Sequence, residues 1–283
     1  MTNSLSLLPL CLLATYFFVG LVIYAVLQRH GRAHCDKDVL TRHASPLLGR
    51  GARHFMMWIL GPYERGLVRL GVSPQWITGA SLVVALLGGI ALARGRFALG
   101  GWLYLVAGIL DILDGRVARA SGRTSTAGAY FDSVADRYAE LFVFAGLAVY
   151  YRDSWRLWLP LAAALGSLMV SYARARGEAL GVDVRIGTMQ RPERLFYLGV
   201  AIAYSPLWET LAGPGGEHPE YLPTVVILAF LGLSSHITAV HRIVHTFRQL
   251  QSQESASAPE RPDVATAPQG VATRLWSRLR PTG

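Results

Sequence analysis

The sequence has 283 residues, of which 52% are hydrophobic and only 16% are charged. Such a chain is too apolar for an ordinary soluble domain and too long for a single membrane anchor. Its two cysteines offer neither a disulfide framework nor a cysteine metal site, so redox chemistry finds no support. The formal net charge is +9, and arginine makes up all but one of the 27 basic residues. Arginine suits phosphate recognition, although the base composition of the genome explains the same bias equally well.

Several apolar stretches approach the roughly 20 residues that a helix needs to cross a bilayer, and none alternates like a membrane β-strand. We therefore predict an all-α, polytopic membrane protein. The first stretch, residues 7–27, predicts an extra N-terminal transmembrane helix within 1–28, and a basic cytoplasmic connector follows over 29–54. Residues 55–70 place apolar residues at helical spacing among charged ones, which is typical of an amphipathic helix at the membrane surface.

Six further spans are predicted after the surface helix. They lie near residues 76–92, 99–118, 126–150, 157–173, 194–207 and 222–244. Together with the surface helix, these six helices form a predicted membrane domain over 55–248. The remaining residues, 249–283, are rich in small and polar residues with nothing to bury, so we predict a disordered cytoplasmic tail.

The connections between the spans alternate in charge. Six basic residues lie between positions 29 and 53, three between 116 and 123 and five between 174 and 194, whereas none lies between 205 and 221. Cytoplasmic loops are enriched in lysine and arginine. This alternation predicts an outside N-terminus and an inside C-terminus, in what we expect to be a prokaryotic cytoplasmic membrane.

Four aspartates lie inside predicted spans, where carboxylates are costly and by default mark function. Asp111 and Asp114 lie near the cytoplasmic end of one span, and Asp132 and Asp136 lie near the cytoplasmic start of the next. At about 100° of rotation per residue, each pair shares one face of its helix. If the two faces meet across the hairpin, four hard oxygen ligands converge at one membrane depth.

Four neighbouring carboxylates need cations to neutralise them. The arginines nearest in sequence are expected at the membrane edge, so metal ions are the better explanation. Carboxylate ligands favour Mg²⁺ or Mn²⁺ over zinc or copper, and a pair of such ions suits phosphoryl transfer. A buried ion-pair network, or the cation pathway of a membrane transporter, is the alternative interpretation of the same aspartates.

The run from residue 111 to residue 136 resembles the signature of the CDP-alcohol phosphatidyltransferase family. It reads Asp-Ile-Leu-Asp-Gly-Arg-Val-Ala-Arg, then eight residues, then Gly-Ala-Tyr-Phe-Asp-Ser-Val-Ala-Asp, and it matches every fixed position of that signature. The resemblance implies an enzyme that moves the phosphatidyl group of CDP-diacylglycerol onto a hydroxyl and releases CMP. It also implies a homodimer among membrane lipids, and no nucleic acid partner is expected. Prenyltransferases with aspartate-rich motifs fit less well, because their usual pattern places carboxylates four apart after an asparagine.

The resemblance also assigns roles to individual residues. The aspartates that would bind two metal ions, Mg²⁺ or Mn²⁺, are Asp111, Asp114, Asp132 and Asp136. Asp136 would in addition be the catalytic base that takes the proton from the acceptor hydroxyl. The positions implied for CDP-lipid binding are Gly115, Ala118, Arg119 and Gly128. The small residues would let the nucleotide approach the helices, and the arginine would face its pyrophosphate.

A second, less specific resemblance concerns the acceptor. Residues 171–181 and 189–194 are similar to the corresponding stretch of prokaryotic members that use inositol phosphate. In that branch, basic residues of this region help to hold a phosphorylated acceptor. The similarity implies acceptor-binding roles for Arg174, Arg176, Arg191 and Arg194. Positive-inside bias alone explains the same arginines equally well.

We therefore expect a phosphorylated polyol as the acceptor, with inositol phosphate favoured. The residues from Asp132 to Arg137 resemble inositol-using members more than glycerol-phosphate members, which usually place proline after the third aspartate. Glycerol 3-phosphate, the acceptor of a phosphatidylglycerophosphate synthase, is the alternative. Glu140 lies one helical turn beyond Asp136, and it is expected either to support the metal site or to pair with a nearby arginine.

Overall fold

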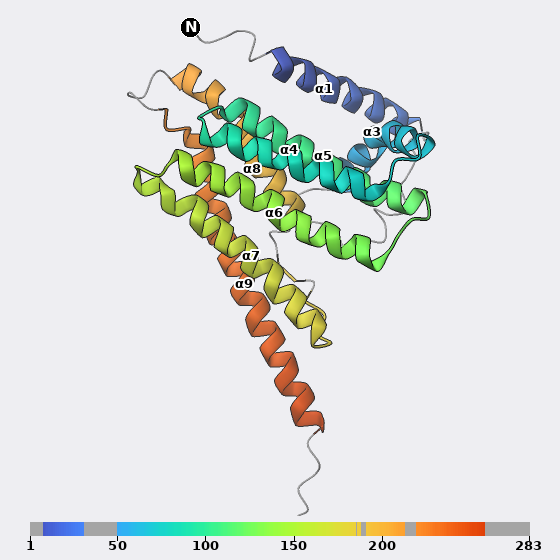
Figure 1. The fold of residues 1–283 in the computed structure, drawn as a ribbon, viewed down its shortest axis with the longest axis vertical. Helices are drawn as coiled ribbons and strands as arrows, with labels where there is room; N and C mark the ends of the chain where they lie inside the picture. The colour runs from blue at the N-terminus through green and yellow to red at the C-terminus, as the bar shows by residue number, and fades with distance from the viewer. Residues whose placement is uncertain (1–7, 31–49, 185, 188–190, 213–218, 258–283) are drawn as a thin grey trace, which may run out of the picture.

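The structure is a computed structural model that describes residues 8–30, 50–184, 186–187, 191–212 and 219–257. Every regular element in these ranges is helical, as the sequence predicts, and Figure 1 shows their arrangement. In chain order the elements are α1 (Leu8–Arg29), α3 (Arg50–Arg69), α4 (Pro74–Ala93), α5 (Phe97–Ala120), α6 (Thr126–Tyr150), η2 (Trp155–Leu157), α7 (Trp158–Ala179), α8 (Arg191–Ala212) and α9 (Leu222–Ser257).

Helices α5 and α6 form a hairpin whose turn is defined by local sequence. Gly122 adopts a φ of 65°, a left-handed conformation that glycine tolerates, and the chain reverses there after α5 ends. Ser125 then starts α6, because its hydroxyl oxygen accepts a hydrogen bond from the Gly128 amide at 3.0 Å. The hairpin therefore brings the last turns of α5 beside the first turns of α6.

Small residues let the backbones of the central helices touch. A Cβ atom on Gly89 of α4 would lie 2.3 Å from the carbonyl oxygen of Phe142 on α6, and one on Gly146 would lie 2.2 Å from the Gly89 oxygen. A Cβ atom on Gly101 of α5 would lie 2.4 Å from the Ala203 nitrogen on α8. Such contacts are typical of helix packing in membranes. Helix α4 thus packs on α5 and α6, while α8 covers α5 and α9 covers both α7 and α8.

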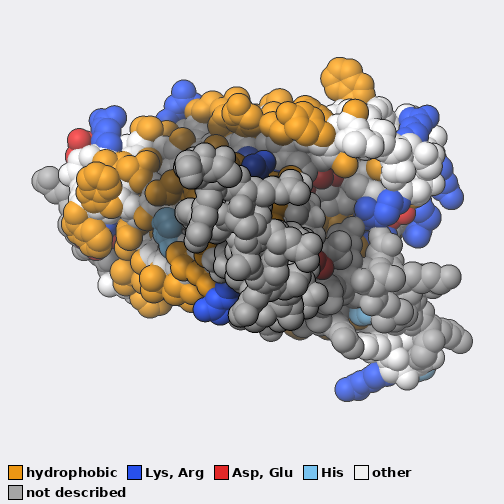
Figure 2. Space-filling model, turned by 90° about the horizontal axis from the view of Figure 1, so that it is seen from below, with side chains coloured by type: hydrophobic (Ala, Val, Ile, Leu, Met, Phe, Trp, Pro, Cys, Tyr) orange, Lys and Arg blue, Asp and Glu red, His pale blue; other side chains and the backbone are white. Residues whose placement is uncertain are grey.

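Five of the described helices are long and apolar enough to cross a membrane: α4, α5, η2 with α7, α8 and α9. Helix α6 carries Asp132, Asp136, Arg137 and Glu140 in its first half, and its composition alone does not select it. Apolar side chains stay exposed on the outer surfaces, as on α9, where Leu233 is 65% exposed. Figure 2 shows these side chains along the body of the molecule and a group of charged ones at the end near α3 and the α5–α6 turn. The fold is that of an integral membrane protein.

Helix α9 extends further than the sequence predicts. We expected a disordered tail from residue 249, but the helix continues through Ser257, and its hydroxyl groups bond within it, as from Ser255 to the Gln251 carbonyl at 2.9 Å. Glutamine, leucine, glutamate and alanine in this stretch are good helix formers, so the helix outlasts the apolar pattern. Residues 258–283 of the predicted tail, and most of the basic connector, lie outside the described residues.

Candidate active site

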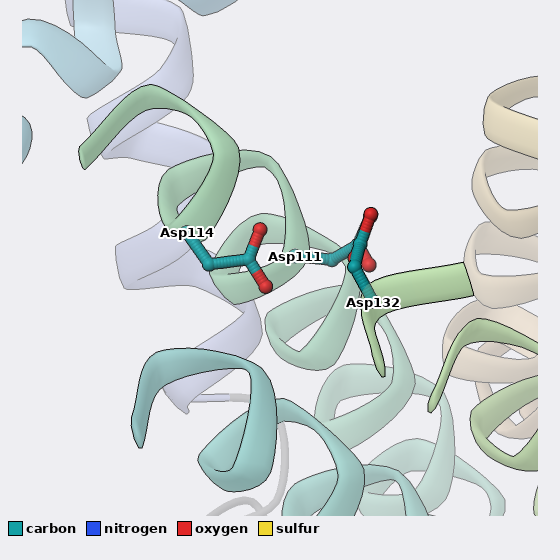
Figure 3. A group of neighbouring side chains, drawn as sticks. All are labelled: Asp111, Asp114 and Asp132. Carbon is teal, nitrogen blue, oxygen red and sulfur yellow. The ribbon is translucent and has the colours of Figure 1, made fainter. Parts of the chain in front are cut away.

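Three of the four signature aspartates meet where α5 faces α6. Asp111 and Asp114 come from α5 and Asp132 from α6, and each offers a carboxylate oxygen within 4.8 Å of the others (Figure 3). Asp114 is buried, whereas the other two are partly exposed. The donor set is made of carboxylate oxygens, which is the chemistry that Mg²⁺ and Mn²⁺ prefer. These residues therefore fit the divalent metal ions that the sequence predicts.

Thr78 of α4 holds Asp114 in place. Its hydroxyl donates a hydrogen bond to Asp114 Oδ2 at 2.6 Å, and both side chains are only 4% exposed. A partner that occupies one carboxylate oxygen orients the other toward a metal ion. Sequence reasoning missed this residue, because its contact with Asp114 crosses 36 residues of sequence.

Asp136 is not one of the three aspartates whose oxygens all lie within 4.8 Å of one another, but its carboxyl group contacts that of Asp111 and lies beside Arg191. Asp136 Oδ1 is 2.7 Å from Arg191 Nη2, and Arg191 Nη1 donates to Asp111 Oδ2 at 2.7 Å. Arg137 approaches Asp136 from its own helix, at 3.5 Å. We expected cationic charge in the site to come from metal ions rather than from arginine. That expectation was incomplete, since the start of α8 brings Arg191 from 80 residues away in sequence.

Four residues are expected to bind the CDP-lipid, and they lie along the hairpin next to the carboxylates. The Arg119 side chain folds back over Gly115, where a Cβ atom would lie 3.3 Å from Arg119 Nη1. Gly128 faces the cap of α6, and a Cβ atom there would lie 3.0 Å from Ser125 Oγ and 3.8 Å from Gln75 of α4. Ala118 is partly buried on α5. At these positions the hairpin itself contributes small residues, and the Arg119 guanidinium covers Gly115.

The arginines expected to bind the acceptor occupy different environments. Arg194 is only 2% exposed, and its Nε donates to Glu140 Oε1 at 2.9 Å. Ser167 of α7 also donates to Glu140, so this glutamate is the partner of an arginine rather than a member of the aspartate cluster. Arg174 is exposed and pairs with Glu178 at 2.8 Å, and Arg176 is exposed on the same helix.

Arg242 of α9 is a further buried cation that sequence reasoning missed. It is 6% exposed and donates to the Val170 carbonyl at 2.7 Å and to the Ile186 carbonyl at 2.9 Å. The positive charges of Arg174 and Arg194 repel the positive charge of Arg242. An arginine inside a predicted span is itself a functional signal, and that signal was available in the sequence.

Comparison with known proteins decides the family. The sequence pattern that defines the CDP-alcohol phosphatidyltransferases matches residues 71–242, which include all four signature aspartates and most of the helices described above. The chain belongs to this family. It is therefore an integral membrane enzyme that transfers a phosphatidyl group. This result confirms the interpretation of the signature as that of a phosphatidyltransferase, in preference to a membrane transporter.

Curated members of the family extend the similarity over most of the chain. The phosphatidylinositol phosphate synthase of Streptomyces avermitilis is 32% identical over 235 residues, which cover 77% of this chain and 92% of the relative. The phosphatidylinositol phosphate synthase of Cutibacterium acnes is 31% identical over 199 residues, covering 69% of this chain and 95% of the relative. An archaetidylinositol phosphate synthase from Methanothermobacter thermautotrophicus is 30% identical over 184 residues, covering 65% of this chain and 87% of the relative.

Two crystal structures of a further family member share the fold. The phosphatidylinositol phosphate synthase of Mycobacterium tuberculosis with bound CDP-DAG aligns with a TM-score of 0.57 at 28% identity, covering 66% of this chain and 92% of that one. The same protein in complex with manganese and citrate aligns with a TM-score of 0.56 at 28% identity, covering 65% and 87%. A manganese complex of a phosphatidyltransferase relative agrees with the carboxylate donor set found here.

Proposed function

We propose that this enzyme transfers the phosphatidyl group of CDP-diacylglycerol to a hydroxyl of inositol phosphate, forming a phosphatidylinositol phosphate and releasing CMP. The observation that carries the proposal is Arg191, whose guanidinium lies within 2.7 Å of both Asp111 and Asp136. A phosphate-binding cation thus stands beside the carboxylate assigned as the base. The relatives named as phosphatidylinositol phosphate synthases support the same acceptor.

The metal ligands in this proposal are Asp111, Asp114, Asp132 and Asp136, which together would hold two Mg²⁺ or Mn²⁺ ions. Bound ions of this kind neutralise phosphate oxygens and stabilise the attacking and leaving oxygens of a phosphoryl transfer. A chelator is expected to abolish transfer, and added Mg²⁺ or Mn²⁺ is expected to restore it. Transfer that survives thorough metal removal would contradict this assignment.

The CDP-lipid is proposed to lie over the α5–α6 hairpin. Gly115, Ala118 and Gly128 leave room for the nucleotide, and Arg119 faces the pyrophosphate, where a guanidinium pairs well with phosphate oxygens. Asp136 accepts the proton of the acceptor hydroxyl. The hydroxyl oxygen forms a bond to the lipid-side phosphorus, and the bond from that phosphorus to CMP breaks.

The acceptor phosphate is proposed to bind near Arg191, with Arg174 and Arg176 available at the exposed end of α7. Arg194 was expected to touch the acceptor too, but its guanidinium is buried and committed to Glu140. Arg194 lies three residues after Arg191 on the same helix. We therefore propose that Arg194 fixes the start of α8 and so the position of Arg191. Arg242, which donates to the Val170 carbonyl of α7, contributes a second buried positive charge.

The decisive experiment offers the purified enzyme CDP-diacylglycerol with one acceptor at a time. Inositol phosphate, glycerol 3-phosphate, serine and free inositol are supplied in separate reactions, and the lipid product is identified by mass spectrometry. We expect the fastest CMP release with inositol phosphate. A preference for glycerol 3-phosphate would keep the chemistry and overturn the inositol assignment, and a preference for serine or free inositol would overturn the phosphorylated acceptor.

We further propose that the enzyme sits in a prokaryotic cytoplasmic membrane as a homodimer, with its N-terminus outside and its C-terminus inside. The charge alternation of the connections supports this orientation, because the α5–α6 turn and the start of α8 are both basic. Thr124→Cys in that turn and Asp153→Cys at the other end provide a matched pair, after Cys11→Ser and Cys35→Ser. An impermeant thiol reagent should label position 153 and spare position 124 in intact cells, and the reverse pattern would refute the orientation.

A further inference from the structure

Arg116 of α5 stands between two positions assigned to the nucleotide, yet its guanidinium reaches α3. Its Nε donates to Glu64 Oε2 at 2.5 Å, its Nη2 lies 2.5 Å from the same oxygen, and its Nη1 is 2.7 Å from Met57 Sδ. Arg116 follows Asp114 by two residues, which is about 200° of helix rotation. The ion pair therefore holds the side of α5 that lies opposite Asp114.

The pair is largely shielded from water, because the side chains of Arg116 and Glu64 are only 11% and 19% exposed. Removing one member of a desolvated ion pair leaves an uncompensated charge, so such a contact resists separation. Apolar packing reinforces it: Leu113 and Val117, which flank Asp114, belong to one buried cluster with Ile59 of α3. A displacement of α3 therefore moves the turn of α5 that carries Asp114.

Helix α3 is itself held on another side by α1, the helix that precedes the family match. Gly20 of α1 packs so closely on α3 that a Cβ atom there would lie 3.1 Å from Ile59 Cδ1. The Tyr24 ring lies 5.7 Å from the Trp58 ring, and the hydroxyl groups of Tyr16 and Tyr63 are 3.0 Å apart. Figure 1 shows α3 between α1 and the end of α5. The extra helix thus braces α3 next to Glu64.

We propose that the Glu64–Arg116 ion pair positions α5 for metal and CDP-lipid binding, with α1 fixing α3 behind it. The inference rests on the metal ligands assigned under the proposed function. Mg²⁺ requires a near-ideal octahedral arrangement of ligand oxygens at about 2.0–2.1 Å, so a small shift of Asp114 relative to Asp132 on α6 weakens the site. Glu64 and Arg116 are positioning residues, and they act on the substrates through Asp114 and Gly115.

The test measures Mn²⁺ binding to the full-length protein in detergent, from the electron paramagnetic resonance signal of free Mn²⁺. Glu64→Gln breaks the ion pair, Glu64→Asp shortens it, and Glu64→Arg combined with Arg116→Glu restores it in reverse. Arg65→Gln is the matched control, because it removes an exposed charge from the neighbouring position of the same helix. The KM for CDP-diacylglycerol and the unfolding temperature are measured in parallel.

We expect Glu64→Gln to weaken Mn²⁺ binding by about 2- to 30-fold, the range that coupled positions usually show, and to raise the KM for CDP-diacylglycerol more than it lowers kcat. Glu64→Asp should have a smaller effect in the same direction, and the reversed pair should regain most of the lost affinity. Wild-type Mn²⁺ affinity in both Glu64 variants, whatever their unfolding temperatures, would overturn the proposal, as would equal weakening in Arg65→Gln. If Glu64→Gln does not fold, Glu64→Asp decides the question.

The measurement also separates this inference from the proposed acceptor. Mn²⁺ binding needs no acceptor, so a wild-type enzyme that prefers glycerol 3-phosphate would leave the positioning role of Glu64 intact. A wild-type protein that binds no Mn²⁺ would instead overturn the metal assignment, and the positioning role would fall with it.

Discussion

The two ends of the helix bundle are built in different ways. At the site end, carboxylates and arginines from α5, α6 and α8 hold one another through ion pairs, as Arg191 does with Asp111. At the opposite end, Phe97 stacks on Tyr221 with ring centroids 3.7 Å apart, and the Tyr150 ring meets Phe97 edge-on at 4.7 Å. The ion pairs of Arg191 with Asp111 and Asp136 can exchange partners when a metal ion or phosphate binds, whereas packed rings have no such partner to exchange. The bundle is therefore fixed at one end and adjustable at the other.

The fixed end joins three connections of the chain. Tyr150 and Tyr151 at the end of α6 donate to the carbonyls of Pro219 and Glu220, at 2.9 and 3.1 Å. Arg156 pairs with Glu220 at 2.6 Å. Tyr221 adopts an unusual φ of 50°, and Glu209 of α8 accepts its amide hydrogen bond at 2.6 Å. A strained tyrosine held by so many partners keeps the α8–α9 connection against α5 and α6.

The largest effect on the adjustable end is expected from the carboxylates themselves. Asp111→Asn or Asp132→Asn removes a metal-binding charge with little change of volume, and it should lower kcat by about 10³-fold because metal ions contribute several kcal/mol to charge stabilisation. Circular dichroism and gel filtration should show a folded protein. Near-normal turnover in either variant would remove the aspartates from the mechanism.

A second, more selective effect is expected at Arg191. Arg191→Gln should raise the KM for inositol phosphate by about 10- to 100-fold and leave the KM for CDP-diacylglycerol within a few-fold, because a guanidinium pairs with the phosphate of the acceptor. Steady-state kinetics with each substrate varied in turn provide the measurement. Arg174→Gln serves as the comparison at the exposed end of α7. Equal changes in both KM values for Arg191→Gln would show that the arginine organises the whole site instead.

Variants of Thr78 test how strongly Mn²⁺ binding at the site end depends on the orientation of Asp114. Thr78→Val keeps the shape of the side chain but removes the hydrogen bond to Asp114, and it should weaken Mn²⁺ binding by about 10-fold. Thr78→Ser, which keeps the hydroxyl, should bind Mn²⁺ close to the wild-type level. Equal Mn²⁺ affinities in Thr78→Val and Thr78→Ser would show that the hydrogen bond from Thr78 to Asp114 does not support metal binding.

The smallest effect on catalysis is expected at the fixed end. Phe97→Leu removes ring contacts to Tyr150 and Tyr221, and it should lower the free energy of unfolding by about 1–3 kcal/mol while kcat stays unchanged. Thermal unfolding in detergent and initial rates below the transition give the two quantities. A fall in kcat that exceeds the loss of folded protein would show that the aromatic end also shapes the site.

Most of the helices could be predicted from the sequence because apolar runs of membrane length are a strong signal. The bounds of α6 match the prediction, since Ser125 supplies a cap that the sequence makes visible. The ends of α7 and α9 were placed too early, because the helical hydrogen bonding continues after the apolar residues stop. The apolar pattern marks only the part of a helix that lies in the membrane. The backbone hydrogen bonds of the helix continue beyond that part.

The site could be predicted only as far as its residues are close in sequence. The spacing of the aspartates placed them on facing sides of one hairpin, and the structure brings Asp111, Asp114 and Asp132 together. The contacts of Thr78 and Arg191 cross 36 and 80 residues, and no local pattern encodes them. The pair of Glu140 and Arg194 crosses 54 residues, and no local pattern encodes it either.

The contact between Gly89 and Gly146 also restricts the path of the donor's two acyl chains. Where the backbones of α4 and α6 touch, no hydrocarbon chain fits between them, so we expect the tails to lie on the outer surface of the bundle, where Val83 and Leu87 of α4 are exposed. On an open surface, no closed end of a pocket limits the length of the acyl chain. We therefore expect similar transfer rates from CDP-lipids with short and long acyl chains, and a sharp optimum at one length would show that an enclosed channel exists.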